Sequence, residues 1–318
     1  MSFLGNMYTV FMQVLTLAIM IAVGFTSDKL GVFTEKSARM CNNMLFYVIT
    51  PCVIVNSFLS VEYTSENAKG FFTALACAAI LHILGMIVTR FVFNKGDKSR
   101  NAVFKYACMY GNMGYMGLPL TKAVLDAVAG NGELGSFYCS AAVICFNAFA
   151  FSHGAYIMSG GEGEKFDRKK IVINPGVISV AIGLPLFLFK VKFPGVLQTP
   201  ISSIGSMNTP LAMMMLGTYL ANANIKDALK EKNVFFTAFL KLIAFPLFLI
   251  CGFRLCGITG NVLIAASVFV ATPTATNTAM FAAKFDKDTA LASQVCGFST
   301  MLSIFTIPVC TALGVLIS

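Results

Sequence analysis

Residues 111–119 read GNMGYMGLP and interrupt an apolar stretch at residues 103–124. Each glycine in a helix interior costs about 1 kcal/mol relative to alanine, and Pro119 lacks a backbone donor and clashes with the preceding turn. A membrane helix is therefore expected to break here. In lipid, the N–H and C=O groups freed by a break are costly unless protein covers them or a watery cavity solvates them. The stretch predicts a cavity near the middle of the membrane.

A second interruption lies half a chain away. Residues 271–277 read ATPTATN and break the apolar stretch at residues 262–283 with Pro273, clustered threonines and Asn277. Interrupted hydrophobic segments at corresponding positions of two halves indicate the binding site of a secondary transporter.

The composition is that of an integral membrane protein. Of 318 residues, 57% are hydrophobic and only 12% are charged, whereas a soluble domain carries roughly a quarter charged residues. Ten apolar stretches are long enough for helices that cross about 30 Å of hydrocarbon. They lie at residues 8–26, 40–59, 71–91, 103–124, 134–158, 171–189, 201–221, 235–255, 262–283 and 290–317. We expect an all-α protein of ten transmembrane helices.

The net charge of +9 reflects membrane topology and not nucleic-acid binding. Most of the 23 Lys and Arg residues fall in alternate loops, those near residues 29–39, 90–105, 165–170, 226–232 and 284–287. The positive-inside rule then predicts a plasma membrane protein (inner membrane in a bacterium) with both termini outside and a cytoplasmic linker at residues 159–170. Lys241 is expected to snorkel from its apolar segment toward water.

Several chemistries are disfavoured. The ten cysteines form no CxxC pair and only His82 and His153 could add imidazole, so neither a metal site nor a cofactor is indicated. The expected span interiors lack Asp and Glu, which disfavours carboxylate-based proton antiport and leaves His82 as the candidate proton carrier. No ATP-binding GxxxxGK[ST] motif and no hydrolase pattern of Ser with His or of paired aspartates occurs, so we expect no enzyme. A receptor that does not transport remains an alternative.

The two halves of the chain show landmarks of an inverted repeat. Shifted by 159 residues, Gly24 falls on Gly183 and the pair Thr50-Pro51 falls on Thr209-Pro210. Each half has five expected spans, so the second half must enter the membrane upside down relative to the first. The predicted organisation is a first repeat at residues 1–158, the linker at 159–170 and an inverted repeat at 171–318.

This topology directs two half-helix N-termini, each carrying about half a positive charge, at one cavity. An anion suits such a place. The breaks also leave two C-terminal ends whose free carbonyls suit a cation such as sodium. The sequence leaves both alternatives open.

Five stretches together resemble the auxin efflux carrier family, which includes plant PIN-FORMED exporters and bacterial permeases assigned to malate or malonate. They read GNMGYMGLPL, NPGVISVAIGLPL, TPLAMMMLGTYL, ATPTATN and STMLSIFTIP, in this order. The resemblance implies two inverted five-helix repeats, crossing broken helices 4 and 9 as in sodium/proton antiporters and bile-acid transporters, and elevator-like movement. A homodimer is a further family expectation.

The resemblance also implies that Asn112 and Asn174 hold a substrate carboxylate. The alternative for Asn112 is an amide that bridges helices, and for Asn174 a helix cap followed by Pro175 at the first helical position. The other expected binding residues are Gly111, Thr276 and Asn277, and the expected crossover residues are Gly114, Gly117, Pro119, Pro273 and Thr274. The linker is short and segment 3 lacks an acidic residue, so the plant-type Asp and Lys pair is missing and auxin is a doubtful substrate.

We therefore expect a permease or efflux carrier that moves a small organic anion by alternating access. The alternative is a sodium-coupled organic-anion symporter of the bile-acid transporter type. The substrate, the direction of transport and the coupling ion are left open by the sequence.

Overall fold

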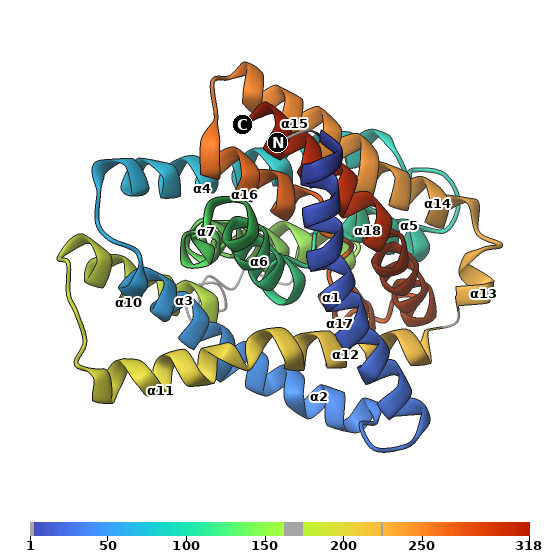
Figure 1. The fold of residues 1–318 in the computed structure, drawn as a ribbon. Coiled ribbons are helices and arrows are strands. Elements are labelled where there is room, and N and C mark those ends of the chain that lie inside the picture. Colours follow the sequence, from blue (N-terminus) through green and yellow to red (C-terminus); the bar gives the residue numbers. More distant parts are fainter. Residues whose placement is uncertain (1–2, 162–173, 224) are drawn as a thin grey trace.

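A computed structural model describes residues 3–161, 174–223 and 225–318 (Figure 1). All regular structure in these ranges is helical, and one isolated antiparallel bridge joins Gly111 to Thr274. The all-α expectation is confirmed. Most of the expected linker at residues 159–170 lies outside the described residues.

In the first half, each expected apolar stretch is helical, although some are divided. The elements are α1 (Phe3–Lys29), α2 (Glu35–Met44), η1 (Leu45–Ile49), α3 (Thr50–Ser60), α4 (Ser65–Phe91), α5 (Lys98–Met109), η2 (Met113–Gly117), α6 (Leu118–Ala129), α7 (Gly132–Phe149), η3 (Ala150–Gly154) and α8 (Ala155–Met158), where η marks a π-helical turn.

The second half is divided in the same manner. Its elements are α10 (Pro175–Leu188), α11 (Gly195–Ser206), α12 (Asn208–Asn222), α13 (Ile225–Ala228), α14 (Lys232–Phe239), η4 (Leu240–Ala244), α15 (Phe245–Leu255), α16 (Gly260–Val270), α17 (Asn277–Lys284) and α18 (Thr289–Ile317).

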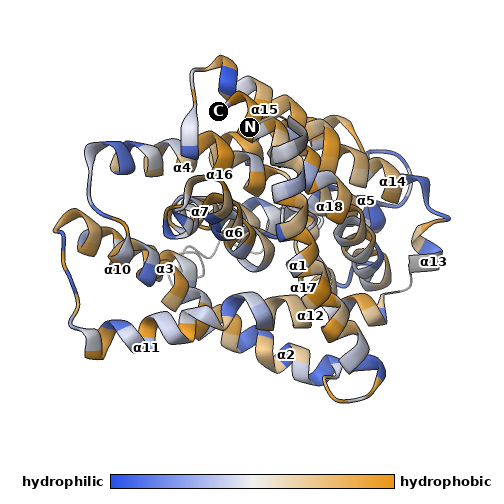
Figure 2. Cartoon of the chain, in the orientation of Figure 1, coloured by the Kyte–Doolittle hydropathy of each residue, from blue (hydrophilic) through white to orange (hydrophobic). Residues whose placement is uncertain are grey.

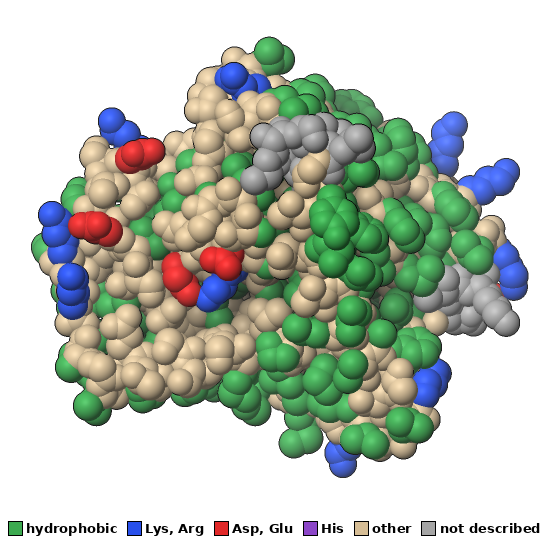
Figure 3. Space-filling model, viewed as in Figure 1, with side chains coloured by type: hydrophobic (Ala, Val, Ile, Leu, Met, Phe, Trp, Pro, Cys, Tyr) green, Lys and Arg blue, Asp and Glu red, His purple; other side chains and the backbone are tan. Residues whose placement is uncertain are grey.

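Six helical segments among the described residues are long and apolar enough to cross a membrane. They are Met7–Lys29, Glu35–Ser60, Ser65–Phe91, Gly132–Met158, Lys232–Leu255 and Thr289–Ile317. The protein is therefore a multi-pass membrane protein. Apolar residues dominate its helices and hydrophilic residues gather in the connections (Figure 2). Hydrophobic side chains cover much of the face in Figure 3, where Lys and Arg lie mainly along the outline.

Three π turns stand directly before prolines, at Pro51, Pro119 and Pro246. In each case the residue before proline donates its N–H to a carbonyl five residues back: Thr50 to Leu45, Leu118 to Met113 and Phe245 to Leu240. The wider turn leaves room for a ring that would clash with the carbonyl four residues back in an α-helix. The expectation that Pro119 breaks its helix is therefore wrong: Pro119 lies in the first turn of α6, and the interruption lies earlier, at residues 110–112.

Helices α1 and α12 pack side by side at backbone distance (Figure 1). A Cβ atom on Gly24 would lie 2.1 Å from the carbonyl oxygen of Met214, and one on Gly217 would lie 2.1 Å from that of Ile21. In a second contact between the two halves, α10 packs on α3, where Gly183 faces the ring of Phe58. Small residues allow membrane helices to approach this closely, since lipid supplies no hydrophobic drive for their association.

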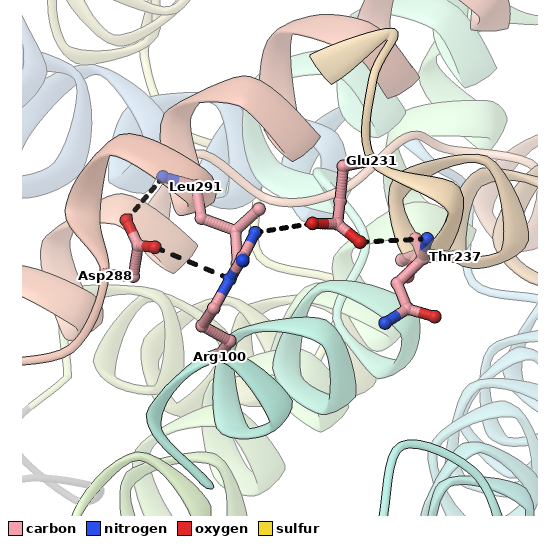
Figure 4. A network of polar contacts seen from close by, with 6 residues as sticks. Arg100, Glu231, Thr237, Asp288 and Leu291 are labelled. Carbon is pink, nitrogen blue, oxygen red and sulfur yellow. Dashed lines mark hydrogen bonds and ion pairs between the residues drawn. The ribbon is translucent and has the colours of Figure 1, made fainter. Parts of the chain in front are cut away.

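Arg100 joins the starts of two helices far apart in sequence (Figure 4). Its guanidinium lies 2.7 Å from Glu231, which caps α14, and 3.7 Å from Asp288, whose carboxylate accepts the Leu291 N–H and so caps α18. The network ties α5, α14 and α18 together at the ends that precede their apolar stretches.

The close contact between α1 and α12 predicts a strong effect of one added methyl group. Replacing Gly217 by Ala should lower stability by about 1–3 kcal/mol, since the methyl would overlap the backbone of α1. The measurement is the thermal midpoint of the purified protein in detergent. Gly252→Ala is the matched control, because a Cβ on this α15 glycine meets nothing within 4 Å. Equal midpoints for the two variants would contradict the close approach.

Candidate functional site at the helix interruptions

The two interrupted segments meet at their breaks. The Ala275 N–H donates to the Tyr110 carbonyl at 2.9 Å, and the Asn112 N–H donates to the Pro273 carbonyl at 2.8 Å. Each break thus satisfies backbone groups that the other leaves free, which meets the requirement for non-helical backbone at membrane depth.

Side chains complete the junction. Thr274 donates its hydroxyl to the Ala107 carbonyl at 3.0 Å, while its N–H donates to the hydroxyl of Ser299 on α18 at 3.2 Å. Thr272 donates to the Phe269 carbonyl within its own helix end. Thr274 thus lies where the two breaks meet, and the contribution of α18 through Ser299 is visible only in the fold.

A cavity of about 40 Å³ lies beside this junction, with room for a few water molecules. Its wall includes Asn112 and Gly114 from the first break and Thr276 and Asn277 from the second. The remaining lining residues come from η1, α3, η2, α7, α10 and the second break: Phe46, Thr50, Met113, Tyr115, Val143, Phe146, Asn147, Gly176 and Ala275.

Asn112 is the polar group with the clearest unmet hydrogen-bonding capacity in this cavity. Only 4% of the surface of Asn112 is exposed, and its Nδ2 has no hydrogen-bond partner among the described residues. Its backbone carbonyl already accepts the N–H groups of Met116 and Gly117, at 3.1 and 2.9 Å. An amide N–H₂ that is buried without an acceptor is costly, so a ligand that supplies an oxygen atom would be stabilised here.

Two helix starts lie in the wall of the cavity. Residues 113–115 open the helical run of η2 and α6, and Asn277 opens α17. The first N–H groups of a helix have no acceptor within the helix, although the Met113 N–H donates to the Gly111 carbonyl at 2.8 Å. The carbonyls of Ala107, Tyr110 and Pro273, which lie at the breaks outside the cavity wall, each accept a hydrogen bond. Both helix starts therefore present the positive ends of their dipoles to the same cavity.

Asn174 does not line the cavity. It caps α10, with its Oδ1 accepting the Gly176 N–H at 2.9 Å. Gly176 itself is in the cavity wall, and a Cβ there would lie 2.7 Å from Nδ2 of Asn147, a buried amide on α7. The sequence alone does not single out Asn147, because one asparagine in an apolar stretch does not indicate a binding site.

Lys241 lies at the crossover, so the expectation that it snorkels is wrong. Its side chain is fully buried in the π turn η4, and its Nζ finds no hydrogen-bond partner in the part of the chain that the structure describes. A Cβ on Gly111 would lie 2.8 Å from this Nζ and 2.4 Å from the Thr272 hydroxyl. The amine points into the bundle because the missing Cβ of Gly111 leaves space for it.

Several other expected residues do not line the cavity: Gly111, Gly117, Pro119, Pro273 and Thr274. Gly111 turns toward Lys241, and Gly117 packs against Cys139 and Thr272.

His82 on α4, the expected proton carrier, is fully buried between the rings of Tyr110 and Phe149, whose centroids lie 5.5 and 5.3 Å from that of the imidazole. Neither of its ring nitrogens has a hydrogen-bond partner among the described residues. No cluster of three His, Cys, Asp or Glu residues that could hold a metal ion occurs in the described ranges.

Comparison with known proteins decides the family. The membrane transport protein family matches residues 9–169 and 163–311, which is nearly the whole chain. The chain belongs to this family, the auxin efflux carriers. It is accordingly a membrane transporter.

Three relatives of this auxin efflux carrier are similar to it along most of their length. An uncharacterized transporter of Methanothermobacter thermautotrophicus is 24% identical over 97% of this chain and 98% of its own. Uncharacterized transporter YfdV of Escherichia coli is 24% identical over 90% and 93% of the two chains. A protein of Rhizobium meliloti named "Putative malonate transporter" is 22% identical over 91% and 90%.

Two glycines of the first break allow a test of the junction in this carrier. Gly111→Ala should lower the thermal midpoint in detergent, because the new methyl would overlap Thr272 and Lys241; about 1–3 kcal/mol is typical of overpacking. Gly114→Ala is the control, since a Cβ there meets nothing within 4 Å and the midpoint should stay at the wild-type value. A Gly111→Ala protein as stable as wild type would show that the junction is looser than described.

Proposed function

We propose that this carrier is a secondary transporter that moves a small organic anion, a carboxylate, by alternating access through the cavity beside the crossover. The observation that carries the proposal is the unpartnered Nδ2 of buried Asn112 in the cavity wall. A carboxylate oxygen is a suitable acceptor for this group, and hydrogen bonds to charged groups contribute about 1.5–3 kcal/mol each.

Electrostatics favour an anion over a cation here. The positive ends of two helix dipoles meet at the cavity, and the buried amine of Lys241 lies against Gly111, the residue before Asn112. No Asp or Glu of the described residues lines this cavity, so its wall supplies no negative charge to balance a cation. Among the proposed binding residues, Thr276 and Asn277 add side chains to the wall, and Asn174 acts indirectly by fixing Gly176.

The name of the Rhizobium meliloti relative supports the carboxylate class. Malonate and similar small dicarboxylates are therefore the first substrates to test. Sodium coupling is the alternative that the same experiment must address.

We further propose ten spans in two inverted repeats, at residues 1–158 and 171–318, in a plasma membrane with both termini outside. The packing of α1 on α12 and of α10 on α3 supports the repeat, because it pairs the first expected span with the seventh and the sixth with the second. The positive-inside rule supports the orientation. The coupling ion is not part of this proposal, and a homodimer belongs to it only as a family property.

The first test measures carboxylate binding to purified protein. Radiolabelled malonate, malate, acetate and auxin are titrated against wild type and Asn112→Ala, with and without sodium. We expect saturable binding of at least one carboxylate and a loss of about tenfold to a hundredfold in the variant, as expected for one hydrogen bond to a charged group. Asn222→Ala, which changes an exposed amide on α12, is the control. Binding that is unaffected in a folded Asn112→Ala protein would move the site elsewhere.

The second test concerns Lys241. Lys241→Met keeps an unbranched side chain and removes the amine, so it should weaken carboxylate binding by about tenfold if the positive charge acts on the ligand. Lys232→Met, at the exposed start of the same segment, should bind as wild type does. Wild-type binding that appears only with sodium would favour the sodium-coupled symporter instead.

A further inference from the structure

A second cavity, separate from the crossover, has a basic wall. It has a volume of about 330 Å³ and lies between α4, α5 and the η3–α8 turn. Arg90, Lys105 and His153 supply its basic groups, and the other lining residues are Met86, Ile87, Thr89 and Ile157. The crossover cavity shares none of these residues.

The charges of this cavity are not neutralised by carboxylates of the described residues. Arg90 has no ion pair within the described ranges, and Lys105 donates only to the neutral amide oxygen of Asn94, at 2.7 Å. His153 shares a hydrogen bond of 3.2 Å with the hydroxyl of Tyr110 through Nδ1. Two cations in one cavity, with an imidazole beside them, favour an anionic ligand with several acceptor oxygens.

The surroundings of the cavity indicate the source of that anion. Ile80, Ile83, Ile87 and Phe91 are exposed at spacings of three and four residues, so they form one apolar face of α4. This face leads directly to Arg90, which lies in the last turn of the helix. In a multi-pass membrane protein such a face contacts hydrocarbon, so an acyl chain lying on it would bring its headgroup to the cavity.

We propose that this cavity binds the phosphate of an anionic phospholipid, with Arg90 and Lys105 as the headgroup ligands and the α4 face as the acyl-chain contact. Basic pockets between membrane helices are suited to such headgroups. The loop that follows Arg90 belongs to the basic set of loops, where attraction to an anionic membrane surface adds to the binding. The proposal is independent of the transported substrate.

The site also lies one hydrogen bond from the crossover. Tyr110 contacts His153 through its hydroxyl and accepts the Ala275 N–H through its carbonyl. A lipid headgroup beside His153 would therefore lie close to a residue that joins the two breaks.

The test is native mass spectrometry of the delipidated full chain. The protein is titrated with phosphatidylglycerol, with phosphatidylcholine of the same acyl chains, and with glycerophosphoglycerol, the soluble headgroup alone. We expect phosphatidylglycerol to bind best and to lose about 25-fold in affinity in the Arg90→Gln/Lys105→Gln variant, since each basic residue near an anionic membrane surface contributes a factor of about five. The control, Lys36→Gln/Lys232→Gln, removes two exposed charges outside the cavity and should bind as wild type does.

Three results would overturn the proposal. Equal binding of phosphatidylcholine would show that charge is not recognised, and glycerophosphoglycerol binding as tight as that of the lipid would make this a site for soluble anions. Wild-type binding in the double variant would exclude Arg90 and Lys105 as ligands. If the double variant does not fold, Arg90→Gln alone serves, with an expected loss of about fivefold, because Arg90 is exposed at the end of α4.

Discussion

Two peptide hydrogen bonds across the crossover are the contact on which the rest of this protein depends. A hydrocarbon medium supplies no water to a broken helix, so the free groups at residues 110–112 and 273–275 must find partners within the protein. They find them in each other, at 2.8 and 2.9 Å. This mutual pairing fixes where the two segments meet, and therefore which helix starts and side chains surround the cavity beside them.

The prolines show a different solution to the same constraint. Pro51, Pro119 and Pro246 remain inside helices because a π turn before each one widens the coil and shifts the hydrogen bonding by one residue. The π turn before Pro246 also carries Lys241. The local adjustment that accommodates a proline thus coincides with the position of a buried amine beside the crossover.

Much of this arrangement is encoded locally and could be predicted. Glycines in a membrane segment and a proline among threonines disfavour a helix whatever surrounds them. Both interruptions are therefore evident in the sequence, as is the position of Asn112 beside the first. The partners of a break are not local information. Lys241 appeared to be one of many lysines near a segment end, and its direction is set by the space that Gly111 leaves on a different helix. Asn147 and Ser299 likewise gain their positions from helices packed far apart in sequence, and Pro119 was misjudged because the π turn absorbs its steric effect.

The glycine contact between α1 and α12 limits how this molecule can change shape. With Gly24 and Gly217 each pressed against the opposite backbone, a shift of one helix along the other by a single residue would drive a larger side chain into main-chain atoms. Sliding of α1 along α12 is therefore sterically blocked, and the two helices form one rigid unit in any conformational change. Any movement that exposes the crossover cavity to opposite sides of the membrane has its sliding surface at another helix pair.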